Sequence, residues 1–128
     1  MKILLDTHAF LWWIRDDPRL SRRARELVTS GRNELFLSVT CVWEILTKTQ
    51  TGKLRLAESA QKFVTEQLTA NNIQVLPLTL DHVFRLEQLP LHHRDPFDRI
   101  LIAQSLEEEF PILSADPLLK NYSATLLW

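Results

Sequence analysis

Short apolar runs alternate along the chain with longer segments in which apolar residues recur at helical spacing. The runs with the length of buried strands are residues 3–5, 35–38, 73–76 and 111–114, with a shorter fifth candidate at 124–127. The helical segments are residues 9–14, 21–31, 39–49, 57–70, 80–89 and 95–109. This alternation predicts an α/β fold in which helices cover both faces of a parallel sheet.

The last of these helices has a charged entrance and an apolar body. Asp95 is a suitable N-cap, Pro96 then takes the first helical position, and Asp98 falls at the third. Residues 100–103 are all apolar, so the helix should be buried on most sides. The two carboxylates lie one turn apart. Either they are capping groups, which the helix dipole favours in the first turn, or they are part of a metal site.

Other acids are expected at the same place. Asp6 ends the first strand, and Asp116 lies two residues beyond the fourth. Asp98 opens the helix that precedes the fourth strand, and Glu44 lies one to two turns into the helix after the second. In a parallel sheet all strands end at one edge, where the crossover helices begin and ligand sites gather. Four acids from four segments are therefore predicted to point at one end of the sheet.

Such a cluster is costly unless a cation compensates the repulsion between the carboxylates. Oxygen ligands without cysteine suit Mg²⁺ or Mn²⁺, which can activate water for attack on a phosphodiester. Each acid also has a simpler interpretation. Asp6 and Asp98 could be capping residues and Asp116 a turn residue, whereas Glu44, on an apolar helix, needs a partner.

Composition narrows the function classes. The 128 residues fit one domain spanning residues 1–128, and a net charge of −1 gives no strong overall field for nucleic acid or anionic membrane. One cysteine rules out an internal disulfide, and two glycines exclude a Walker loop and a dinucleotide-binding glycine motif. No signal peptide or apolar membrane span is evident, so a soluble cytoplasmic protein is expected.

Four stretches together resemble the PIN-domain family, specifically its VapC-type toxin ribonucleases. They are residues 4–9 (LLDTHA), 42–45 (VWEI), 93–104 (HRDPFDRILIAQ) and 112–116 (ILSAD), of which the third is the most specific. The resemblance covers nearly the whole chain. It implies a three-layer α/β/α fold, a metal-dependent endoribonuclease activity, a cognate antitoxin and a homodimer.

The resemblance also assigns residues. The family's metal-binding acids correspond to Asp6, Glu44, Asp98 and Asp116. Thr7 matches a hydroxyl residue that supports the first acid, and Ser114 stands where the family often has threonine. The role of Asp95 stays open, because it shares a helix face with Asp98 and could assist the site or only cap the helix.

Substrate contacts are less determined. Arg94 and Arg99 flank the acids and could hold RNA phosphates. His8, His92 and His93 lack zinc spacing and are expected to have at most water-mediated or substrate roles. A basic cluster around the first two helices is at least as readily a solvated helix face; it comprises Arg15, Arg19, Arg22, Arg23 and Arg25.

Two other function classes match the sequence less well. A haloacid-dehalogenase-like phosphatase also begins with a strand that ends in aspartate, but it needs a second acid two residues on, where this chain has His8. A catalytically silent PIN-fold binding module would lack some of the acids, and all four are present.

Overall fold

A single parallel sheet forms the centre of the protein, seen here in a computed structural model that describes residues 1–91 and 94–128. The strands within these residues are β1 Lys2–Leu5, β2 Glu34–Ser38, β3 Ile73–Leu76, β4 Ile112–Leu113 and β5 Leu126–Leu127. They pair in the order β3-β2-β1-β4-β5, with every neighbouring pair parallel. The chain moves from β1 outward to β3 and then returns to the other side of β1, which creates a topological switch point between β1 and its neighbours.

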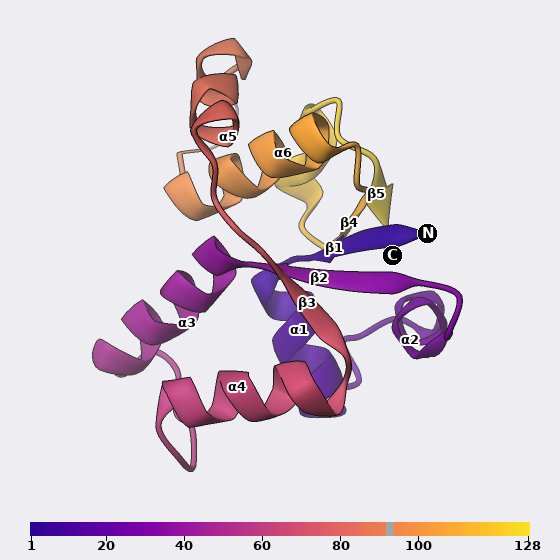
Figure 1. The fold of residues 1–128 in the computed structure, drawn as a ribbon, viewed down its shortest axis with the longest axis vertical. Coiled ribbons are helices and arrows are strands. Elements are labelled where there is room, and N and C mark those ends of the chain that lie inside the picture. Colours follow the sequence, from indigo (N-terminus) through magenta and orange to yellow (C-terminus); the bar gives the residue numbers. More distant parts are fainter. Residues whose placement is uncertain (92–93) are drawn as a thin grey trace.

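Helices cover both faces of this sheet. The helical elements are α1 Thr7–Ile14, α2 Arg22–Thr29, α3 Val39–Gln50, α4 Ala60–Ala70, α5 Leu80–Arg85, η1 Leu86–Gln88, α6 Pro96–Glu108 and η2 Pro117–Asn121. Figure 1 shows α1 to α4 on one side of the sheet and α5 and α6 on the other. The predicted three-layer α/β/α arrangement is therefore confirmed.

The core follows from the apolar runs that define the strands. Ile3, Leu4 and Leu5 of β1 are fully buried because neighbouring strands flank β1 on both sides and helices cover its faces. Residues 100–103 of α6 are buried as predicted. Cys41 is a core residue, and its burial raises the thiol pKa to about 12, so the thiol stays protonated.

Several predicted boundaries shift by a few residues. Helix α1 begins at Thr7 because Asp6 caps it, and α4 begins at Ala60 because Ser59 caps it. The helix predicted over residues 80–89 divides into α5 and η1, and the 3-10 helix η2 was not predicted. Strand β5 is only two residues long. Among the described residues, no helix is long and apolar enough to cross a membrane.

Candidate metal centre

Acidic side chains from separate segments meet at the carboxyl edge of the sheet. They line a cavity of about 90 Å³ that is formed by Asp6, Thr7, His8, Glu44, Lys48, Asp95, Asp98 and Asp116. The structure thus brings together all four acids predicted from strand ends and helix starts, together with Asp95. Their convergence follows from topology, because β1 lies between β2 and β4 and the elements after these strands begin at the same edge.

Asp6 sits at the end of β1 and is nearly inaccessible to solvent, with 7% of its surface exposed. Its Oδ1 accepts a hydrogen bond of 2.7 Å from the backbone N–H of Ala9, which makes Asp6 the N-cap of α1. Burial raises the pKa of its carboxyl group, and the charge of Asp116 adds to the effect. Hydrogen bonds from Ser114 and Ala9 and the charge of His8 oppose it. Asp6 therefore carries a charge at an energetic cost, which a nearby cation would lower.

Glu44 is held from both sides in the second turn of α3. Its Oε1 accepts a hydrogen bond of 2.5 Å from the Thr7 hydroxyl, and its Oε2 lies 3.1 Å from the Lys48 ammonium. The expected partner for this buried acid therefore exists. The family resemblance gives Thr7 as a support of the first acid, whereas its hydroxyl here donates to Glu44. The side chain that bonds Asp6 is Ser114.

The two acids at the start of α6 have different positions in the helix. Asp95 is the N-cap, and its Oδ1 accepts a hydrogen bond of 2.9 Å from the Phe97 N–H. Asp98 lies in the first turn and is half-buried. Asp116 resembles Asp95, since its Oδ1 caps η2 through the Leu118 N–H at 3.0 Å. Capping and a place at the cavity therefore coexist in Asp6, Asp95 and Asp116.

The donor set fits a hard divalent cation. The cavity offers five carboxylates, and these hard oxygen donors suit Mg²⁺ or Mn²⁺ better than they suit zinc. Burial, and to a smaller extent the charge of Asp116, raises the pKa of Asp6, so a cation in the cavity would stabilise its charged form. As the side chains stand, no three acidic, histidine or cysteine groups of residues 1–91 and 94–128 converge on one point as an ion would require.

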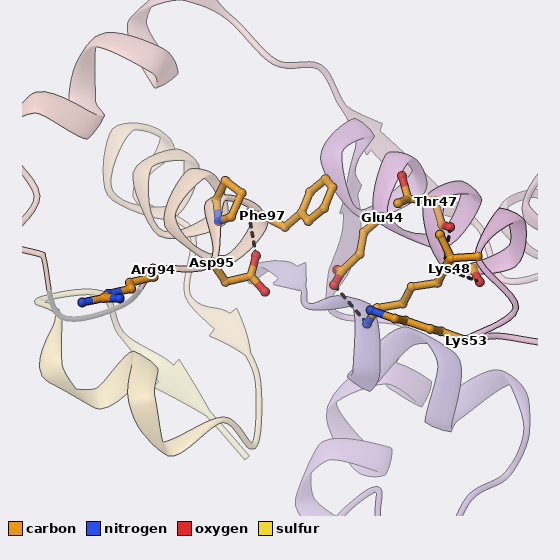
Figure 2. A pocket seen from close by; sticks show the side chains of 9 residues that line it. Glu44, Thr47, Lys48, Lys53, Arg94, Asp95 and Phe97 are labelled. Atoms are coloured by element: carbon orange, nitrogen blue, oxygen red, sulfur yellow. Dashed lines mark hydrogen bonds and ion pairs between the residues drawn. The ribbon is translucent and has the colours of Figure 1, made fainter.

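A larger groove of about 470 Å³ adjoins this cavity. It runs between the second half of α3, the turn after it and the start of α6 (Figure 2). Glu44, Lys48 and Asp95 line both spaces. Lys48 and Lys53 in the groove were not among the predicted site residues. The spacing of Lys48, four positions after Glu44 on one helix, was the signal that could have identified it.

The two arginines predicted to contact phosphate differ in their surroundings. Arg94 is exposed and lines the groove, and in Figure 2 its side chain extends away from Lys48 and Lys53. Arg99 instead donates to the backbone carbonyls of Pro90 at 3.0 Å and Leu86 at 3.4 Å. It thereby ties the segment before α6 to the helix.

The remaining candidates lie around the first two helices. His8 lines the acid cavity and stacks on Trp12, with 5.6 Å between the ring centroids. Most of the basic cluster is engaged within the chain. Arg19 pairs with Asp17, Arg22 with Glu26 and Arg25 with Asp16, and Arg15 donates to the Arg55 carbonyl. His92 and His93 lie outside the described residues.

Comparison with known proteins adds a family to this geometry. The family model of the PIN domain matches residues 3–124. Ribonuclease VapC22 of Mycobacterium tuberculosis is 23% identical over 121 residues, which cover 94% of this chain and 91% of that protein.

Solved structures show the same fold at low sequence identity. VapBC2 from Rickettsia felis, bound to a DNA fragment from its promoter, matches with a TM-score of 0.75 and 15% identity, covering 99% of this chain and 98% of the other. VapBC-1 from nontypeable Haemophilus influenzae matches with a TM-score of 0.65 and 10% identity, covering 99% and 97%. A toxin–antitoxin complex from Klebsiella pneumoniae matches with a TM-score of 0.65 and 13% identity, covering 98% and 96%.

Proposed function

The chain belongs to the PIN-domain family, and from this premise we propose that it is a Mg²⁺- or Mn²⁺-dependent endoribonuclease, the toxin of a toxin–antitoxin pair. The observation that carries the proposal is the cavity at the carboxyl edge of the sheet, where acids from four separate segments meet. The similarity to a ribonuclease along nearly the whole chain supports the same activity.

Each residue of the cavity has a role that follows from its position. Asp6, Asp98 and Asp116 would hold the ion, Glu44 would bind it or orient the attacking water, and Asp95 could assist. When bound, a divalent ion supplies activation of water and neutralises charge on the leaving oxygen. The Thr7 hydroxyl and the Lys48 ammonium fix the Glu44 carboxylate between them. Attack on phosphorus would leave a 5′-phosphate and a 3′-hydroxyl.

Protein partners form the second half of the proposal. We infer that a cognate antitoxin binds this chain, since the structural neighbours include VapBC proteins and a toxin–antitoxin complex.

We also infer a homodimer. The apolar side chains of Leu80 and Phe84 on α5 are 65% and 60% exposed, which is a surface that a second subunit could cover. A cytoplasmic location is part of the same proposal. Light scattering on the purified chain tests the dimer.

The activity is tested with Asp6→Asn and Asp98→Asn in purified protein, and Asp81→Asn is the matched control. Asp81 is an exposed acid in the first turn of α5 that does not line the cavity. Each site variant loses a carboxylate that would hold the metal, and with it several kcal/mol of transition-state stabilisation. Its Mn²⁺-dependent RNA cleavage should therefore fall by at least about a hundredfold. The control should cut like the wild type.

Two results would contradict the proposal. Wild-type cleavage rates in either site variant would remove the acids from the reaction. A wild-type chain that binds its antitoxin, yet neither cleaves RNA nor binds Mn²⁺ at millimolar concentration in calorimetry, would be a catalytically silent binding module.

A further inference from the structure

The groove adjoins the acid cavity. Glu44, Lys48 and Asp95 line both, so a chain lying in the groove passes beside the carboxylates. The groove volume of about 470 Å³ is several times the 90 Å³ of the acid cavity. An ion and water fit the small cavity, whereas a nucleotide-sized group needs the space of the groove.

The groove supplies positive charge where the acid cavity has negative charge. Figure 2 shows the Lys48 and Lys53 side chains extending toward the end of Glu44. Lys48 is paired with Glu44, and its side chain is only 29% exposed. Lys53 is exposed and forms no ion pair with any carboxylate of the described chain. Its ammonium can therefore offset the repulsion that a phosphate would meet beside the acids.

The opposite wall carries an aromatic ring. Phe97 is half-buried and lines the groove, and Trp43 packs edge-on against it with 5.1 Å between centroids and 84° between the ring planes. A ring fixed by a neighbour loses little freedom when a base packs on it. Stacking on aromatic side chains, next to cations that follow the backbone, is a common way for proteins to bind single-stranded nucleic acid.

We propose that this groove is a subsite for single-stranded RNA, holding the nucleotide next to the scissile phosphate. Lys53 contacts the backbone phosphate beside the Lys48–Glu44 ion pair, and Phe97 packs against the base. The inference rests on the proposed ribonuclease function. It moves the main phosphate contact away from Arg99, whose guanidinium is bonded to the Leu86 and Pro90 carbonyls.

Binding is measured apart from cleavage, by fluorescence anisotropy of a short single-stranded RNA in EDTA. Lys53→Ala is compared with Lys62→Ala, which removes an exposed ammonium from α4, outside the groove. The loss of one phosphate contact should reduce the slope of log K against log salt concentration by about 0.7 in Lys53→Ala. The slope for Lys62→Ala should stay at the wild-type value.

A second pair of variants tests the ring. Phe97→Leu should weaken RNA binding by roughly fivefold or more without changing the salt slope. Its control is Phe110→Leu, which alters a comparable ring pair, Phe110 with Phe36 at 4.9 Å, beyond the other end of α6. Thermal unfolding of all four variants confirms that they fold.

The outcomes separate the two proposals. If the wild type cuts RNA and Lys53→Ala binds RNA with the same slope as Lys62→Ala, the subsite is overturned and the ribonuclease stands. If the wild type neither cuts nor binds RNA, both are overturned. If Lys53→Ala loses more affinity for a poly-glutamate peptide than for RNA, the groove selects an acidic protein segment, and the RNA subsite is overturned.

Discussion

The Thr7 hydroxyl donates a buried hydrogen bond of 2.5 Å to Glu44 Oε1, across 37 positions of sequence. The bond links the first turn of α1 to the second turn of α3, and both helices follow strands at the carboxyl edge of the sheet. A buried carboxylate oxygen needs a donor, because leaving it unpaired costs free energy comparable to its lost hydration. Thr7, the residue after the Asp6 cap, thus holds Glu44 at the cavity.

Replacing Thr7 by valine should therefore lower the free energy of unfolding. Valine keeps the shape of threonine but removes the donor, so Glu44 Oε1 loses its partner at a cost of about 1–3 kcal/mol. Thr7→Ser keeps the hydroxyl and should recover most of that loss. Urea unfolding of the two variants in EDTA measures the difference. Equal stability in Thr7→Val and Thr7→Ser would show that the hydroxyl does not stabilise the fold.

The Asp6 carboxyl group gives a pH-dependent prediction. Its pKa in the folded chain is raised above the ordinary value of 3.8, chiefly by burial. Its contribution to stability is therefore complete below that value and is lost as pH rises through the folded pKa. Asp6→Asn removes the charge and keeps an acceptor for the Ala9 N–H. In EDTA the variant should match the wild type at about pH 4 and be more stable at neutral pH. A gap that widens on acidification would contradict this sign.

The edge of the sheet could be predicted from the sequence, because parallel topology brings strand ends and helix starts together whatever the detailed packing. Asp6, Glu44, Asp98 and Asp116 were placed there by this rule, and the cavity contains all of them. The Asp95 cap was equally local, since it depends only on the residues that follow. These features depend on hydrophobic periodicity and helix caps, and both are determined by residues that are close together in the sequence.

Contacts between distant elements could not be predicted in this way. The partner of Thr7 depends on how α1 packs near α3, and the carbonyls that bind Arg99 depend on the path of the chain from η1 to α6. His82 had no assigned role, yet it is fully buried. The 3-10 helix η2 is too short to give a periodic pattern.

His82 joins α5 to α6 through a hydrogen-bond network. Its Nδ1 accepts from the Thr79 N–H at 3.1 Å, so its Nε2 carries the proton and donates to Glu108 Oε1 at 2.8 Å. His82→Leu would leave the Thr79 N–H without this partner and should lower the free energy of unfolding by about 2 kcal/mol. Glu108→Gln keeps the accepting Oε1 and should cost less. Thermal unfolding tests the order, and RNA cleavage per folded molecule should be unchanged in both variants.

Arg99 gives a prediction that separates a structural role from substrate binding. Arg99→Ala removes two charge-assisted bonds to backbone carbonyls and should destabilise the chain by about 1–3 kcal/mol. Because the guanidinium is occupied in this way, the salt slope of RNA binding should stay near the wild-type value. A slope reduced by about 0.7 would restore Arg99 as a phosphate contact. The measurement is anisotropy in EDTA at several salt concentrations, at a temperature where the variant is folded.

Metal binding should appear as a gain in thermal stability that depends on the acids of the cavity. A ligand that binds only the folded state adds RT ln(1 + [L]/Kd), which is about 1.4 kcal/mol at ten times Kd and corresponds to roughly 4 °C for a domain of this size. Mn²⁺ should raise the midpoint of the wild type and of Asp81→Asn by similar amounts. It should shift Asp98→Asn much less, since one carboxylate ligand is lost while the first turn of α6 keeps its Asp95 cap. An equal shift in Asp98→Asn would show that Mn²⁺ binds elsewhere on the chain, because removing the Asp98 carboxylate weakens only a site to which it contributes.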